Sequence, residues 1–363
     1  MAKVYVLGGR ERGVELRERT EAHDWCLYNT ALILEVDPET GVVRTRVEYE
    51  SPREVRAGDR PAGNFHTGAL VGDTLYTCTT TEVLIFRLPE FRQIGYISLP
   101  CFNDVHHVTP SSDGNLLVVT TGLDMVVKIT PQGETLAEWS VTGEPPWTRF
   151  SRSIDYRKVE STKPHTAHPN FVFELDDEVW ATRAFMRDAI CLNRPGKRIA
   201  MDGEMPHDGL VCGDKIFFTG IDGKVVVVDR RTLQVCRMID LRKIQDKDRE
   251  VLPAWCRGLL PIDERRMWVG FSRIRKTIFT ENVRWVKTIL REGTIVRPTH
   301  IALFDLVAHE CVREIELEPY GMNGIYGIFS AYNLAKNANL SCDHDAPGRS
   351  VLTETQQSSV RIE

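Results

Sequence analysis

Residues 205–220 read MPHDGLVCGDKIFFTG, and this stretch decides the fold. His207 stands before a short apolar run, a Gly213-Asp214 turn follows, and a second apolar run ends at Gly220. Two short apolar runs that flank a two-residue Gly-Asp turn are typical of a β-hairpin. The stretch therefore predicts two antiparallel strands, with a histidine at the head of the first.

The same design recurs along the chain. FHTGALVGDTLYTC holds it at His66, with a Gly-Asp turn at the same offset. Looser copies begin at His107 and His168, and a fifth begins at Arg257, where arginine takes the place of the histidine. Further β-branched and aromatic runs give each copy four strands, and the copies start about 40 residues apart. Four antiparallel strands at that period are typical of the blades of a β-propeller.

The two ends of the chain supply a sixth blade. Runs at 4–9, 31–36 and 42–49 predict three of its strands, and residues 324–331 predict the innermost one. Pairing both ends in one sheet would close the ring and leave no exposed edge between the first and last blades. We therefore predict an all-β fold, a six-bladed β-propeller that forms a single domain over residues 1–332.

The composition and net charge argue against nucleic-acid-binding, membrane-spanning and disulfide-rich classes of protein. The net charge of −5 gives no basic footprint for nucleic acid or an anionic membrane, and no apolar run is long enough to span a bilayer. The nine cysteines are scattered and never form C-x-x-C, which favours reduced thiols over disulfides or a cysteine zinc site. We expect a soluble cytoplasmic protein that acts on a small molecule. Residues 333–363 are polar and without periodicity, and we predict a disordered tail there.

Three insertions interrupt the repeats, at residues 10–30, 144–167 and 273–298. Each falls either just before an innermost strand or between the second and third strands of a blade. In an antiparallel blade these two places lie on the same face, so we expect all three insertions to rise around one mouth of the central channel. Long loops in compact domains are usually functional or disordered, and the aromatic residues in these insertions favour packed lids. Shielding of the propeller or a role in oligomerisation is the alternative.

The histidines at the heads of the repeats predict a metal site. Innermost strands converge on the propeller axis, so equivalent first positions should form a ring, and neutral imidazole suits Zn, Fe, Cu and Ni. The predicted ligands of a divalent transition metal (Fe, Zn, Mn or Cu) are His66, His107, His168 and His207. Two assignments stay open. His106 competes with His107, because neighbours in an extended strand face opposite ways. His165 competes with His168, or serves as an acid/base group in the lid. A polar channel lining without metal is the alternative.

Further candidates surround this ring. Arg257 heads the fifth inner strand, where its guanidinium would hold a carboxylate, sulfate or phosphate of a substrate. An ion pair with a neighbouring blade is the alternative for this arginine. Either Asn323 or Tyr326 heads the sixth strand, and Tyr326 could donate a proton, as could His106 or His165. Charged residues on the loops that should face the same mouth, with positioning or structural roles, are Arg183, Arg273, Asp124 and Asp222.

Residues 104–139, DVHHVTPSSDGNLLVVTTGLDMVVKITPQGETLAEW, resemble the blade repeat of six-bladed propellers of the NHL and arylsulfotransferase type. As architecture the resemblance extends over residues 66–330. Peptidylglycine amidating lyases of that superfamily bind zinc through histidines from separate blades, to which the four histidines here are similar in placement. Carotenoid-cleaving oxygenases hold iron with four histidines, but on seven blades. The calcium-binding Glu, Asn and Asp set of lactonase-type propellers has no counterpart on these inner strands.

The sequence therefore favours a metal-dependent enzyme that acts on a small, anionic molecule in the central channel. Lyase or hydrolase chemistry is the first expectation, and oxygenase chemistry with Fe(II) is the second. The alternative is a propeller scaffold without catalysis, which binds a protein or ligand and whose channel is incidental.

Overall fold

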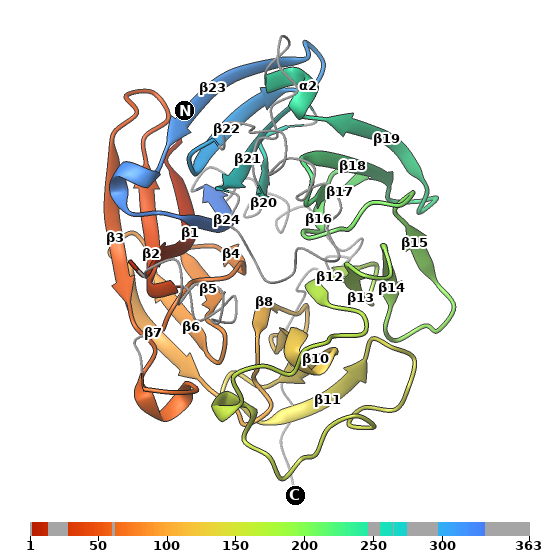
Figure 1. The fold of residues 1–363 in the computed structure, drawn as a ribbon. Helices are drawn as coiled ribbons and strands as arrows, with labels where there is room; N and C mark the ends of the chain where they lie inside the picture. The colour runs from red at the N-terminus through yellow and green to blue at the C-terminus, as the bar shows by residue number, and fades with distance from the viewer. Residues whose placement is uncertain are drawn as a thin grey trace, which may run out of the picture.

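The computed structural model describes residues 2–13, 28–59, 62–245, 255–263, 265–273 and 297–330. These residues form six four-stranded antiparallel sheets arranged as a ring (Figure 1). The innermost strands face the centre of the ring and the fourth strands lie at its rim. The predicted fold class, a six-bladed β-propeller with four strands per blade, is confirmed. No helix among the described residues is long and apolar enough to cross a bilayer.

In the first five blades the strands run in chain order from the innermost to the outermost, and in the sixth blade the innermost strand comes last in the chain. The first blade contains β4 (Ala69–Val71), β5 (Thr74–Cys78), β6 (Val83–Arg87) and β7 (Arg92–Ile97); the second, β8 (Val105–Pro110), β9 (Leu116–Thr120), β10 (Met125–Ile129) and β11 (Thr135–Ser140); the third, β12 (Pro169–Leu175), β13 (Glu178–Arg183), β14 (Asp188–Cys191) and β15 (Arg198–Ala200). The fourth contains β16 (Leu210–Cys212), β17 (Lys215–Gly220), β18 (Lys224–Asp229) and β19 (Val235–Asp240); the fifth, β20 (Trp255–Pro261), β21 (Arg266–Ser272), β22 (His300–Asp305) and β23 (Glu310–Glu316); the sixth, β24 (Gly324–Ser330), β1 (Val4–Glu11), β2 (Tyr28–Val36) and β3 (Val43–Tyr49).

The sixth blade closes the ring with both ends of the described chain. β24 pairs antiparallel with β1, from Val4 opposite Ser330 to Gly9 opposite Gly324. This pairing confirms that residues near the C-terminus supply the innermost strand. Of the three predicted insertions, 144–167 lies within the described residues, whereas most of 10–30 and of 273–298, and the predicted tail, lie outside them.

The core lies between neighbouring blades, because the central strands carry apolar residues on both faces. β17, β21 and β22, for example, bring Phe217, Val269 and Phe304 into one buried cluster that spans the fourth and fifth blades. Such burial contributes about 25 cal/mol for each Å² of apolar surface removed from water. The packed walls hold the inner strands in place around the axis.

Buried hydroxyls at the ends of the second strands tie down the beginnings of several inner strands. The Thr77 hydroxyl donates to the carbonyl oxygen of His66 at 3.0 Å, and that of Ser272 accepts the Ile325 N–H at 2.8 Å. The Thr182 hydroxyl accepts the Phe171 N–H at 3.0 Å. These bonds fix the backbone at the mouth of the channel, where the predicted site lies.

We expect Gly8→Ala to destabilise the propeller, because ring closure leaves no room for a side chain there. A Cβ on Gly8 would collide with the backbone oxygen of Gly324 in β24 and approach the sulfur of Met322 to 2.5 Å. Overpacking of this kind costs about 1–3 kcal/mol. Gly13→Ala is the matched control, because a Cβ at Gly13 meets no described residue within 4 Å. Urea denaturation of both variants measures the difference, and equal midpoints would contradict the packing described here.

Candidate metal centre

Six side chains, one from each blade, surround the axis at the mouth of the channel. They are His66, His106, His168, His207, Arg257 and Tyr326. The ring centroid of His66 lies 4.6 Å from that of His106 and 4.5 Å from that of Tyr326. His106 lies 5.2 Å from His168 and 6.1 Å from His207 by the same measure. The blades therefore bring four imidazoles together from four separate sheets.

The structure places His106 in this ring and His107 outside it. His107 is buried in the wall between blades, where its ring stacks on Phe171 at 3.7 Å. Its Nε2 bonds the Gly68 carbonyl oxygen at 3.2 Å, and its Nδ1 accepts the Val172 N–H at 3.3 Å. Burial lowers the pKa of His107 to about 3. Both ring nitrogens are occupied, so the assignment of His107 as a ligand is corrected to His106.

A β-bulge explains the exchange. The pairing of β8 with β9 shifts register between Val105 and His107, so that His106 is the extra residue. A bulge re-aims a side chain that regular alternation would send to the other face of the sheet. The sequence shows two adjacent histidines but not the position of the bulge.

His66 and His207 present ring nitrogens that no described residue satisfies. His66 Nε2 lies 2.9 Å from the side-chain nitrogen of Asn64, while His66 Nδ1 and Asn64 Oδ1 both lack a partner in the described part of the chain. Exchanging the amide oxygen and nitrogen of Asn64 lets Oδ1 accept from Nε2 and leaves the lone pair of His66 on Nδ1. His207 is buried and neither of its ring nitrogens has a partner there. Burial lowers the pKa of both side chains well below the usual value. Buried polar atoms without partners are costly, which favours a ligand that they bind.

His106 is oriented for coordination by a second residue. Its Nδ1 lies 2.7 Å from Asn170 Oδ1, and because the Asn170 amide nitrogen donates to the Pro206 carbonyl, Nδ1 carries the proton. Nε2 then has a lone pair, and it lies 3.2 Å from Asp104 Oδ1. Two ligands held about 2.1 Å from a tetrahedral ion are about 3.4 Å apart, so this spacing fits shared coordination.

Asp104 is the candidate ligand that the sequence analysis missed. One donor atom from each of His66, Asp104 and His106 lies within 4.8 Å of the others. Asp104 is held at a backbone φ of 51°, in the left-handed region. Burial opposes its ionisation, but the interactions of Asp104 with the nearby imidazoles and with Lys163 outweigh burial, and the pKa of Asp104 lies well below its usual value. The Asp-x-His pattern at 104–106 is the only trace of this pair in the sequence.

His168 belongs to the ring, and His165 stands behind it. The two Nδ1 atoms face each other at 2.8 Å, so one donates and the other accepts. The Thr162 hydroxyl donates to the Gly122 carbonyl oxygen at 2.5 Å and lies 3.4 Å from His165 Nε2. Because the Thr162 hydroxyl proton is used on Gly122, its oxygen accepts from His165 Nε2, which therefore carries the proton of His165. His165 Nδ1 then accepts the hydrogen bond from His168 Nδ1. The lone pair of His168 is thereby fixed on Nε2.

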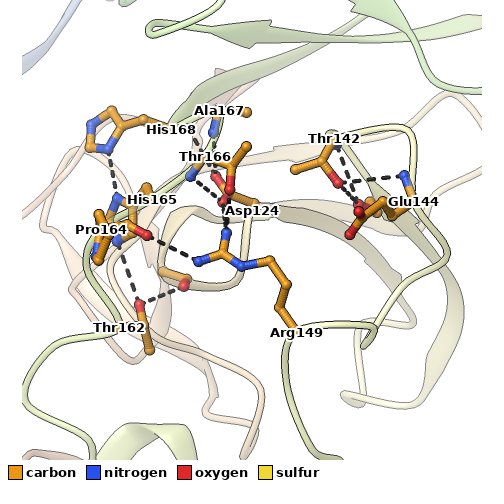
Figure 2. A network of polar contacts seen from close by, with 12 residues as sticks. Asp124, Thr142, Glu144, Arg149, Thr162, Pro164, His165, Thr166, Ala167 and His168 are labelled. Atoms are coloured by element: carbon orange, nitrogen blue, oxygen red, sulfur yellow. Dashed lines mark hydrogen bonds and ion pairs between the residues drawn. The ribbon is translucent and has the colours of Figure 1, made fainter.

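Asp124 anchors the segment that carries both histidines (Figure 2). Its carboxylate accepts the N–H groups of Thr166 at 2.7 Å, of Ala167 at 3.1 Å and of His168 at 2.9 Å. Arg149, from the same insertion, pairs with Asp124 at 2.8 Å. Four donors on one buried carboxylate hold His168 at a φ of 53°, a conformation that a histidine seldom adopts.

Arg257 and Tyr326 complete the ring. The Arg257 guanidinium carbon lies 5.1 Å from the Tyr326 ring centroid and 5.8 Å from that of Trp255. The Tyr326 hydroxyl lies 3.4 Å from that of Tyr28. The other charged loop residues named from the sequence are in ion pairs: Arg183 with Asp188, Asp222 with Lys224, and Arg273 with Glu11 and Glu318.

Comparisons with known proteins reach the fold only. No protein-family model and no curated protein matches this sequence. A protein of unknown function from Bacteroides caccae is similar in structure, with a TM-score of 0.57 at 13% identity, over 90% of this chain and 98% of that one. A chain from a nidogen/laminin complex has a TM-score of 0.53 at 9% identity, over 90% and 97% of the two chains. The chain is thus identified by its fold, as a six-bladed β-propeller.

Proposed function

We propose that this propeller is a metal-dependent enzyme whose site lies on the channel axis. His66, His106, His168 and His207 would hold a divalent transition metal, Fe, Zn, Mn or Cu, and Asp104 would join them. The substrate would be a small, anionic molecule. Lyase or hydrolase chemistry is the first expectation, and Fe(II) oxygenase chemistry is the second.

The observation that carries this proposal is the set of unsatisfied nitrogens inside the ring. Both ring nitrogens of His207 and Nδ1 of His66 are buried without a partner among the described residues. The lone pairs of His106 and His168 are left free by the bonds that their other nitrogens make. Neutral imidazoles with one carboxylate are a donor set that suits zinc, iron or manganese.

The protein residues would divide the remaining tasks. A bound divalent ion supplies Lewis acidity, which polarises a substrate oxygen or activates water. Asn170 and His165 fix the tautomers of His106 and His168, as partners of metal-bound histidines commonly do. His165 and Tyr326 are the candidates for moving a proton, because the assignment of His106 as a ligand removes it from that role. Arg257 would bind the anionic group of the substrate.

Metal analysis of untagged protein tests the proposal. We expect about one equivalent of a transition metal per chain, and its loss in His66→Ala and in His207→Ala while circular dichroism stays unchanged. His309→Asn is the matched control, because His309 is exposed on the turn between β22 and β23, and asparagine tolerates its left-handed backbone. Metal-free protein that tolerates all three substitutions would favour a non-catalytic scaffold.

A further inference from the structure

Arg257 is a cation of the ring that forms no direct ion pair within the described residues. Among the described residues it forms no ion pair and no hydrogen bond, and its Nε is buried without an acceptor. Its guanidinium is instead held against the rings of Trp255 and Tyr326. Cation–π contacts of this kind hold the group in place but leave its N–H donors free. A half-buried guanidinium whose donors are not used by the described residues favours binding of an anion.

The carboxylate of Asp208 is already used in hydrogen bonds that join two blades. Asp208 follows His207 and is buried, and its Oδ2 accepts hydrogen bonds from the Thr219 hydroxyl and from the Gly258 N–H at 3.2 Å. Burial raises the pKa of Asp208 to about 6. Asp208 therefore ties the fourth blade to the fifth, and its charge acts on Arg257 without a direct ion pair between the two side chains.

A bound divalent metal would leave an excess of two positive charges at the ring. The charge of Arg257 is balanced by Asp208, and that of Lys163 is balanced by Asp104. The histidines that bind a metal are neutral. A divalent cation would add two positive charges, and no side chain of the ring compensates them. A buried site with such an excess favours a dianion over a monoanion.

We infer that the substrate is a small organic dianion of the dicarboxylate class. One carboxylate would lie on the Arg257 guanidinium, and an oxygen of the second would lie on the metal held by His66, His106 and Asp104. This inference rests on the proposed function and adds to it the substrate class. Arg257 then acts as the residue that selects the substrate by charge.

Calorimetric titration with malonate and malonamate tests the inference. The two probes have nearly the same size and shape, but malonamate carries one carboxylate fewer. Untagged protein with its metal content measured should bind malonate at least about tenfold more tightly than malonamate. In Arg257→Gln the metal content should stay the same and the preference should disappear. Arg92→Gln, an exposed position on β7, is the control that should keep the preference.

The readouts separate the two proposals. Equal affinities for malonate and malonamate in metal-loaded protein would overturn the dianion inference, and so would a preference that survives Arg257→Gln. The measured metal content reports on the proposed function alone. Protein that takes up no metal would refute that function whatever the titration shows.

Discussion

Replacing His106 by alanine should abolish metal binding, whereas replacing its neighbour His107 should keep the metal and weaken the fold. His106 faces the channel, with Nδ1 bound to Asn170 and Nε2 beside Asp104. Loss of a residue that only orients a ligand costs about 10–100-fold in metal affinity, and loss of the ligand should cost more. His106→Ala should also cost about 1–3 kcal/mol of stability, because it takes a hydrogen-bond partner away from the buried Asn170 and Asp104, so metal content is the readout that decides.

His107→Ala should keep its metal and lose more stability. The variant loses the stacking of His107 on Phe171 and leaves the Val172 N–H without its acceptor. A cavity and an unsatisfied buried donor together cost about 2–4 kcal/mol. Metal content and urea denaturation, measured on both variants, give two independent readouts. Loss of metal in His107→Ala, with retention in His106→Ala, would show that the bulge in β8 is misplaced.

The blades could be predicted from the sequence because the signals that define them are local. The Gly-Asp turn at 213–214 and the alternation of residues around it specify one hairpin, and repetition of that hairpin specifies the ring. The closing strand at 324–330 could also be found, because one blade otherwise lacks an inner strand. Ring membership of His66 and His207 follows from the same register.

The finer geometry of the site could not be predicted in this way. A bulge exchanges His106 for His107, and no residue type in that stretch announces where the extra residue lies. Asn170 reaches His106 from the third blade, so their proximity depends on tertiary packing and not on spacing in the chain. Asp104 is only two residues from His106, but its place beside Nε2 depends on the bulge and on its left-handed backbone. The sequence predicts His165 and His168 as alternatives for one position in the ring. They instead form a hydrogen-bonded pair, and their spacing in the sequence does not indicate this bond.

Asp124 is the position where a single substitution should both destabilise the protein and alter the metal site. Asp124→Ala removes the acceptor for three consecutive N–H groups and the partner of Arg149. We expect Asp124→Ala to lower the free energy of unfolding by about 3 kcal/mol, most of it from the unsatisfied N–H groups. The lost ion pair contributes less, because Arg149 is one-third exposed and the pair is partly screened by solvent.

The same substitution should weaken metal binding, because His168 would no longer be held in its left-handed conformation. Asp124→Asn is the matched control: it keeps an acceptor oxygen and tolerates the φ of 50° at this position, so its loss of stability and of metal should be smaller. Arg149→Gln should cost less than about 1 kcal/mol and leave the metal in place. Urea denaturation and metal titration of the three variants should rank them Asp124→Ala, Asp124→Asn, Arg149→Gln. If Asp124→Ala weakened the fold yet bound metal like the wild type, His168 would not be a ligand, because a ligand freed from its anchor cannot keep its full contribution to affinity.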